Sequence, residues 1–173
     1  MFKRKDILFS LLFLVYLLLL SGVILFKLPF YTASFYSGSR VINLIPFQGA
    51  FVGFNVVGSI WREIIYNILL FIPFGIYLSL WHPKWSFWKK LMTIFLLSLF
   101  FETIQFIFTL GISDITDLIN NTFGGLIGMI FYQTMDKLFK ERANTVIISV
   151  ATIVTILAVW QFGSLFYRSW LMM

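Results

Sequence analysis

Long stretches of apolar residues, separated by segments that carry most of the charged residues, make up most of the chain. Five of them are close to the length of a bilayer-spanning helix, which needs about 20 residues at a rise of about 1.5 Å each. They cover residues 7–26, 63–81, 91–110, 117–135 and 146–166. The pattern predicts an all-α integral membrane protein, a bundle of about five transmembrane helices in which residues 1–173 form a single membrane domain.

Basic residues precede the first apolar stretch, an arrangement that secretory signal peptides and retained membrane anchors share. The stretch is longer than the apolar core of a signal peptide, which has about 7–15 residues. Residues 21–26 also contain no small-x-small cleavage signature. We therefore expect residues 1–26 to form a retained N-terminal anchor helix. Residues 144–173 are expected to form the last helix and a short tail.

The segment between the first two predicted spans is rich in aromatic residues, which favour the membrane interface. Apolar side chains recur at steps of three and four residues from Phe51 to Trp61, so residues 49–62 are expected to be an amphipathic interfacial helix. The second span carries polar and helix-breaking residues in its interior, namely Asn67, Pro73 and Gly75. Lipid tolerates such residues where neighbouring helices satisfy the backbone, so this span is expected to pack centrally.

The composition indicates that the solvent is lipid. Hydrophobic residues make up 60% of the 173-residue chain and charged residues 12%, whereas soluble domains have about 25% charged residues. The net charge is +6, but the basic residues lie in short groups at the ends of apolar runs and form no stripe, so no nucleic-acid partner is expected. The sequence contains no cysteine, which excludes disulfides, thiolate nucleophiles and cysteine metal sites.

The basic residues also set the expected orientation of the chain. Nine of the thirteen lie on one side of the predicted spans, and the side richer in Lys and Arg faces the cytoplasm. The amino terminus is therefore expected in the cytoplasm and the carboxyl terminus outside. The nine are Lys3, Arg4, Lys5, Lys84, Lys89, Lys90, Lys137, Lys140 and Arg142, and the other four are Lys27, Arg40, Arg62 and Arg168.

Two polar side chains interrupt the third predicted span. Glu102 lies about 16 Å from its cytoplasmic end at a rise of about 1.5 Å per residue. Gln105 follows one turn later on the same face. An ionised carboxylate at this depth costs roughly 2.5–3.5 kcal/mol on insertion scales unless it is partnered, hydrated or protonated. Glu102 is therefore expected to face the bundle interior or a wet cavity.

The fourth predicted span begins with a group of polar residues. If its helix starts near Ser113 as the N-cap, then Asp114, Asp117 and Asn121 lie on one face. The helix dipole also favours acids at this positive end, so simple capping is an alternative explanation. Deeper in the span, small residues predict close helix–helix packing through a GxxxG spacing: Gly124, Gly125 and Gly128.

The amides Asn67, Gln105 and Asn121 are expected at similar depths in the outer half of the membrane, close to the three carboxylates. Polar groups are rare in spans and mostly face interiors or pathways, which favours a ligand-binding site. A hydrogen-bonded network that only holds the helices together is the alternative. No residue is assigned as catalytic, and Glu102 and Asp117 are the candidates for a general base.

Other site chemistries have less support. His82, the one histidine of the sequence, lies in the polar segment after the second span, which argues against Ser-His-Asp catalysis and histidine-ligated zinc. The three carboxylates could hold Mg²⁺ together with water, but the sequence has no tight run of oxygen ligands, so neither a metal nor a cofactor is expected. Arg40 and Arg62, in the outer segment, could hold a lipid phosphate or an anionic cell-wall group.

Four motifs in this order resemble the VanZ-like family: NLIPF at 43–47, NILLFIPFG at 67–75, ETIQ at 102–105 and DITDLINNTFGG at 114–125. The resemblance covers residues 43–131, the expected core. It implies a small bacterial cell-membrane protein accessory to glycopeptide antibiotic resistance and associated with teicoplanin. The positions that match the family pattern are Asn67, Pro73, Gly75, Glu102, Gln105, Asp114, Asp117, Asn121 and Gly124.

Three functions stay open. The first is a non-enzymatic envelope protein that modulates the action of acyl-anchored, teicoplanin-type lipoglycopeptides by binding a lipid-linked cell-wall precursor or the drug. The second is an intramembrane enzyme on a lipid or isoprenoid phosphate, with Glu102 or Asp117 as base and Asn121 orienting the substrate. The third is a small transporter or flippase component, although the spans contain no inverted repeat. The lipid bilayer is a partner in each case, and the oligomeric state is left open.

Overall fold

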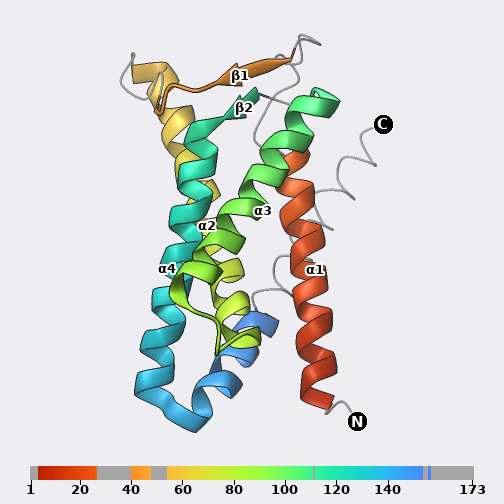
Figure 1. Ribbon diagram of the computed structural model, residues 1–173, viewed down its shortest axis with the longest axis vertical. Coiled ribbons are helices and arrows are strands. Elements are labelled where there is room, and N and C mark those ends of the chain that lie inside the picture. Colours follow the sequence, from red (N-terminus) through yellow and green to blue (C-terminus); the bar gives the residue numbers. More distant parts are fainter. Residues whose placement is uncertain (1–3, 27–39, 48–53, 111, 154–155, 157–173) are drawn as a thin grey trace. The chain divides into compact units, whose positions relative to one another are not determined.

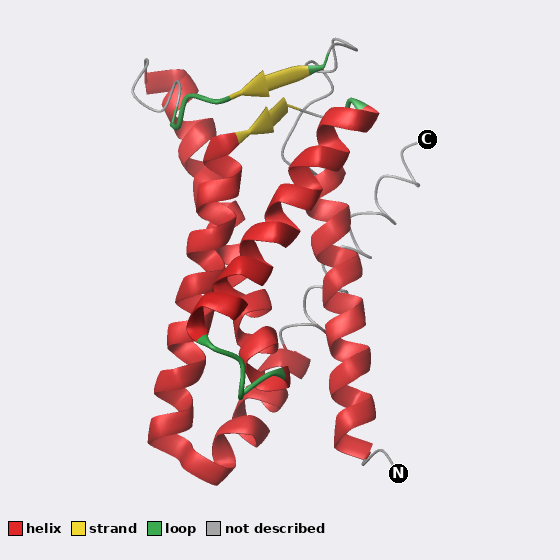
Figure 2. Ribbon diagram, in the orientation of Figure 1, coloured by secondary structure: helices red, strands yellow, loops and turns green. Residues whose placement is uncertain are grey.

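The computed structural model describes residues 4–26, 40–47, 54–110, 112–153 and 156. Helices make up most of this part of the chain, together with two three-residue strands (Figure 1, Figure 2). In chain order the elements are α1 (Arg4–Phe26), β1 (Val41–Asn43), α2 (Phe54–Trp81), α3 (Phe87–Phe108), β2 (Ile112–Asp114), α4 (Ile115–Phe139), the 3₁₀ helix η2 (Lys140–Arg142) and a further helix, Ala143–Ile153.

The chain divides into two compact units. One consists of Met1–Leu19 together with Met135–Met173, and the other is the continuous segment Leu20–Thr134. In the first unit, buried apolar side chains come from both of its segments: Phe9, Leu12, Ala143 and Ile147. All residues predicted to bind a ligand lie in the second unit, which therefore holds the candidate site.

Within the described residues, three helical segments are long and apolar enough to cross a membrane: Ile7–Leu25, Trp61–Trp81 and Phe87–Phe108. They correspond to the first three predicted spans. Helix α4 has 25 residues, or about 37 Å at about 1.5 Å per residue, but buried polar residues such as Asn120 and Asn121 lower its apolarity. The fifth predicted span, 146–166, begins inside helix Ala143–Ile153 and otherwise lies almost wholly outside the described residues.

Helix α2 begins at Phe54 rather than at Glu63 and continues without a break. Residues 54–62, expected to belong to a separate interfacial helix, are therefore the first turns of α2. The rest of that expected helix, up to residue 53, lies outside the described part of the chain. A single glycine, Gly58, costs about 1 kcal/mol in a helix interior, which is too little to separate two helices.

The strands β1 and β2 form a small parallel sheet. The expectation of a purely helical fold is therefore wrong at this point. Val41 to Asn43 pair in register with Ile112 to Asp114. Figure 1 shows the pair at the end of the second unit where α4 begins. Three residues per strand are too few for the alternation of apolar and polar positions that marks a strand in a sequence. The pairing places Asn43 beside Asp114, 71 residues later in the chain.

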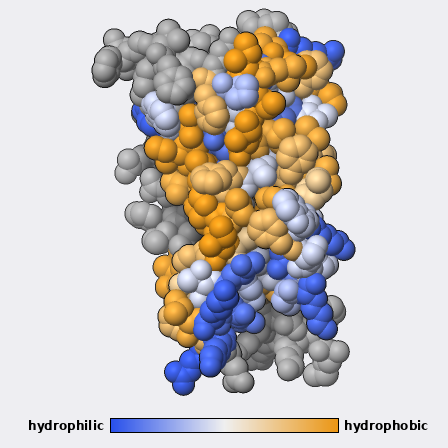
Figure 3. Space-filling view, turned by 60° about the vertical axis from the view of Figure 1, so that its left-hand side comes forward, coloured by the Kyte–Doolittle hydropathy of each residue, from blue (hydrophilic) through white to orange (hydrophobic). Residues whose placement is uncertain are grey.

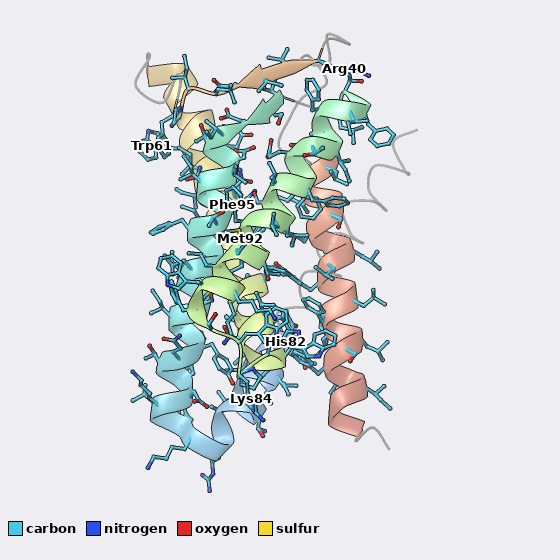
Figure 4. All side chains as sticks on the ribbon, in the orientation of Figure 1. Arg40, Trp61, His82, Lys84, Met92 and Phe95 are labelled. Atoms are coloured by element: carbon cyan, nitrogen blue, oxygen red, sulfur yellow. The ribbon has the colours of Figure 1, made fainter. Side chains whose placement is uncertain are left out.

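Helices α2 and α3 form an antiparallel hairpin with a short connection. His82, in this connection, stacks on Trp85 and Trp81 with ring centroids 3.8 and 6.2 Å apart. Figure 4 places His82 at the opposite end of the second unit from Arg40 and Trp61. The histidine is therefore engaged in a stack of aromatic rings and is remote from the end of the unit that carries β1.

The second unit buries polar side chains within its apolar core and exposes many large apolar side chains, unlike a water-soluble bundle. Six residues of α3 are buried. Four of them are polar, namely Lys90, Ser98, Glu102 and Gln105, and the other two are Ile94 and Phe101. Its large exposed hydrophobic residues are Phe87, Trp88, Met92, Leu96, Leu99, Phe100, Ile107 and Phe108. Figure 3 shows apolar side chains across the middle of the face that it draws. Such a distribution is typical of helices surrounded by lipid.

Helices α2 and α4 approach each other backbone to backbone. Gly124 lies against the carbonyl oxygen of Ile68, so that a Cβ atom on this glycine would collide with it. Gly128 lies in the same way against the carbonyl oxygen of Ile72. The absence of a side chain at both glycines is what permits this approach.

The third helix meets the other two at the same glycine-rich stretch. Gly75, two residues after the proline inside α2 at Pro73, lies against the carbonyl group of Gly125 in α4. A Cβ atom on Gly125 would in turn meet the side chain of Ile94 in α3. The positions Gly75, Ile94 and Gly125 therefore mark one level at which α2, α3 and α4 converge.

Candidate functional site

Asp114 is the centre of the candidate site, at the point where β2 ends and α4 begins. Its Oδ1 accepts a hydrogen bond from the backbone N–H of Thr116 at 2.7 Å, which makes Asp114 the N-cap of α4. The expectation that Ser113 has this role is wrong, because pairing with β1 keeps that residue in a strand. Asp114 Oδ2 accepts from Asn43 Nδ2 at 2.9 Å, and its backbone N–H donates to Glu102 Oε2 at 2.8 Å. One residue thus joins β1, α3 and α4.

A further carboxylate, Asp117, lies in the first turn of α4. Its Oδ1 accepts a hydrogen bond from Asn67 Nδ2 of α2 at 2.6 Å. The two side chains are 6% and 8% exposed, respectively, so this contact joins α2 to α4 inside the unit. The partial positive charge at the start of a helix favours a carboxylate in this place.

The hydrogen bonds of Asn43, Asn67, Glu102, Asp114 and Asp117 form a polar network. Two more amides extend this network. Asn121, one turn deeper in α4, donates from Nδ2 to Ser98 Oγ at 2.9 Å. Gln105 donates from Nε2 to the backbone carbonyl of Ile24 in α1 at 2.9 Å. All three side chains are fully buried. Asn67, Gln105 and Asn121 therefore bond to partners on three different helices, α4, α1 and α3 respectively.

The loop after β1 is held against this network. The backbone N–H of Ile45 donates to Asn43 Oδ1 at 3.1 Å, and that of Phe47 donates to Thr116 Oγ1 at 2.9 Å. Phe47 has a φ of 57°, a left-handed conformation that costs of order 1–3 kcal/mol for a residue with a side chain. The hydrogen bond to α4 helps to hold this strained residue, and strained residues cluster at functional sites.

The network concentrates negative charge and hydrogen-bond acceptors. Donors to its three carboxylates include two side-chain amides and two backbone N–H groups, all of them neutral. The two arginines predicted to bind an anion lie at the surface. Arg40 has its guanidinium carbon 5.9 Å from the ring centroid of Phe106, and Arg62 is exposed on α2.

Some of the hydrogen-bonding capacity of the network is unused by the described residues. Buried side-chain atoms without a hydrogen-bond partner among the described residues include Gln105 Oε1 and Asn121 Oδ1 of the network and Nδ2 of the adjacent Asn120. Buried polar groups are nearly always satisfied by protein, water or a ligand, so these atoms mark places where water or a ligand group fits. In the same part of the chain, no group of three His, Cys, Asp or Glu residues is placed to hold a metal ion.

The sequence did not identify three members of the network: Asn43, Ser98 and Thr116. Ser98 lies one turn before Glu102 on the same helix face, so helical spacing alone could have indicated it. Asn43 and Thr116 lie inside two of the motifs, but their contacts depend on the pairing of β1 with β2. No local sequence signal predicts that pairing.

Replacing Asp114 by alanine is expected to destabilise the second unit by about 1–3 kcal/mol, because it removes an N-cap worth about 1 kcal/mol and leaves hydrogen-bond donors unsatisfied. Asp114→Asn is the matched control, since asparagine also caps helices. Thermal unfolding of the purified protein in detergent, followed by circular dichroism, measures both variants. An alanine variant as stable as the wild type would contradict the capping role.

Comparison with known proteins identifies relatives of this chain. The family model of VanZ/LLP1 matches residues 13–140, a range that contains every residue of the candidate site. The chain is 37% identical over 145 residues to Protein VanZ of Enterococcus faecium, and the alignment covers 83% of this chain and 85% of that protein. No solved structure matches the chain.

Proposed function

The chain belongs to the VanZ/LLP1 family, and from this premise we propose that it is a multi-pass protein of the bacterial cell membrane that modulates susceptibility to teicoplanin-type lipoglycopeptides. The proposed route is non-enzymatic: a polar site in the outer half of the bundle binds a lipid-linked cell-wall precursor or the lipoglycopeptide. The observation that carries the proposal is the network around Glu102, Asp114 and Asp117, held inside a unit whose exterior is apolar.

The proposed topology has five spans, with α4 and the C-terminal helix as the fourth and fifth. Basic residues in the connection between α2 and α3 and in the first turn of α3, Lys84 and Lys89, support a cytoplasmic place for this end of the second unit, because the side richer in Lys and Arg faces the cytoplasm. Lys84 lies at the opposite end from Arg40 (Figure 4). In this orientation the amino terminus is cytoplasmic and Asp114 lies toward the outer surface.

The chemistry of the network supports binding rather than catalysis. Its hydroxyl groups are engaged by amides and a backbone N–H: Ser98 Oγ accepts from Asn121, and Thr116 Oγ1 accepts from Phe47. Among the residues that the structure describes, neither hydroxyl is paired with a carboxylate that could activate it as a nucleophile. Carboxylates in a poorly solvated site instead bind ammonium, amide or hydroxyl donors strongly, and the sugars and peptides of both proposed ligands offer such donors.

The test is expression of this chain in a teicoplanin-sensitive Gram-positive host. We expect the minimal inhibitory concentration of teicoplanin to rise relative to the empty vector, with a smaller change for a glycopeptide that has no acyl chain. Immunoblotting of the membrane fraction confirms that the protein accumulates. Unchanged teicoplanin susceptibility would contradict the proposed function, and an equal change for both drugs would contradict the role of the acyl anchor.

A further inference from the structure

A second polar cluster lies at the opposite end of the second unit from the carboxylates. Lys90 of α3 is 6% exposed and Ser79 of α2 is fully buried. Among the described residues, Ser79 Oγ has no hydrogen-bond partner and no acidic side chain pairs with Lys90. Burying a cation is costly unless an anion or several hydrogen bonds compensate it. A buried cation and an unsatisfied buried hydroxyl at the same end of the unit therefore offer the kind of donors that an anionic group accepts from.

The helical hairpin places Ser79 and Lys90 at one level. Ser79 lies close to the end of α2 and Lys90 close to the start of α3, so each is about one turn or less from the connection between them. One turn further from the connection, Gly75 and Ile94 both lie against Gly125 of α4. Because residues one turn apart share a helix face, Ser79 and Lys90 face the same interior one turn below that contact.

The surface around this cluster is basic and aromatic. Lys84 is exposed, Lys89 Nζ lies 4.2 Å from the ring centroid of Trp85, and Trp88 is 74% exposed. Tryptophan favours the headgroup region of a bilayer, where its apolar ring and N–H group are both accommodated. The start of α3, capped by Ser86, adds the partial positive charge of a helix N-terminus.

We propose that Lys90 and Ser79 bind the phosphate group of a membrane-lipid headgroup. The ammonium group of Lys90 and the hydroxyl group of Ser79 each donate a hydrogen bond to a phosphate oxygen, which neutralises the buried charge and satisfies the hydroxyl. The exposed tryptophans favour a lipid over a free phosphate ion, because they place this level of the bundle among headgroups. This site is distinct from the carboxylate network and does not depend on the function proposed for it.

The test is lipid binding to the purified full-length protein in detergent, measured by native mass spectrometry with phosphatidylglycerol as the probe. Lys90→Met keeps an unbranched side chain of nearly the same length and removes its charge. It is expected to weaken binding roughly tenfold or more, the value of one charge-assisted hydrogen bond. Ser79→Ala is expected to weaken binding as well. Lys84→Met, the matched loss of an exposed charge, is expected to change binding by no more than about twofold.

The outcomes separate specific binding from general attraction. Wild-type affinity in both Lys90→Met and Ser79→Ala would overturn the proposal, and so would an equal loss in Lys84→Met. Displacement of phosphatidylglycerol by inorganic phosphate would assign the site to a free ion and overturn the lipid assignment, whereas retention of the lipid supports it. Circular dichroism verifies the helical content of each variant, and Ser79→Ala decides the question if Lys90→Met does not fold.

Discussion

Gly128→Leu is expected to prevent α2 and α4 from packing, so that the second unit does not form. The carbonyl oxygen of Ile72 occupies the place that a Cβ atom would need, and this oxygen belongs to helix backbone that cannot move aside alone. Inserting groups into a well-packed interior costs about 1–3 kcal/mol and sometimes more. The loss of stability is expected to lie at the upper end of this range for Gly128→Ala and above it for Gly128→Leu. The total stability of a protein is of order 5–15 kcal/mol, so the leucine variant is not expected to fold.

Other glycines provide graded controls for this prediction. Around Gly22 of α1, no atom from elsewhere in the described part of the chain lies within 4 Å of where a Cβ atom would be, whereas a Cβ on Gly125 meets the Ile94 side chain. Alanine is therefore expected to be neutral at Gly22, intermediate at Gly125 and most harmful at Gly128. The yield of monodisperse protein after detergent extraction and the midpoint of unfolding give the order. Equal midpoints for Gly22→Ala and Gly128→Ala would show that the close approach does not limit stability.

The sequence predicted the parts of the fold that follow from helical spacing. A GxxxG spacing predicts close packing because residues four apart share a helix face, and Gly124 and Gly128 both lie against the backbone of α2. The cost of a carboxylate in lipid predicts that Glu102 faces inward, and this side chain is 4% exposed. Both predictions need only the spacing of residues along one helix and the apolar nature of its surroundings, and the local sequence specifies both.

The parts that the sequence did not predict depend on contacts between distant segments. The bond between Asn43 and Asp114 requires strand pairing across two intervening helices. The same pairing extends the strand through Asp114, which moves the N-cap of α4 one residue beyond Ser113. The separate interfacial helix was predicted from the recurrence of apolar side chains, but that periodicity is equally compatible with the longer α2 that forms.

Glu102→Gln is expected to abolish the effect of this protein on teicoplanin susceptibility while leaving its fold intact. The amide oxygen of glutamine can still accept the hydrogen bond that Glu102 Oε2 receives from the backbone N–H of Asp114, so the structural contact survives. The negative charge is lost. The binding free energy of a ligand whose donor pairs with this carboxylate is then expected to fall by about 1.5–3 kcal/mol, which is roughly a ten- to hundredfold loss of affinity.

Asp117→Asn applies the same reasoning to the contact with Asn67, because an asparagine oxygen can accept from Asn67 Nδ2 as the carboxylate does. Asp136→Asn is the matched control, since it removes an exposed carboxylate from α4 outside the network. We expect all three variants to accumulate and unfold like the wild type, but only the control to keep the wild-type inhibitory concentration of teicoplanin. If Glu102→Gln and Asp117→Asn also keep it, the carboxylates act only as acceptors that hold the helices together, because acceptance is the one property that the amides preserve.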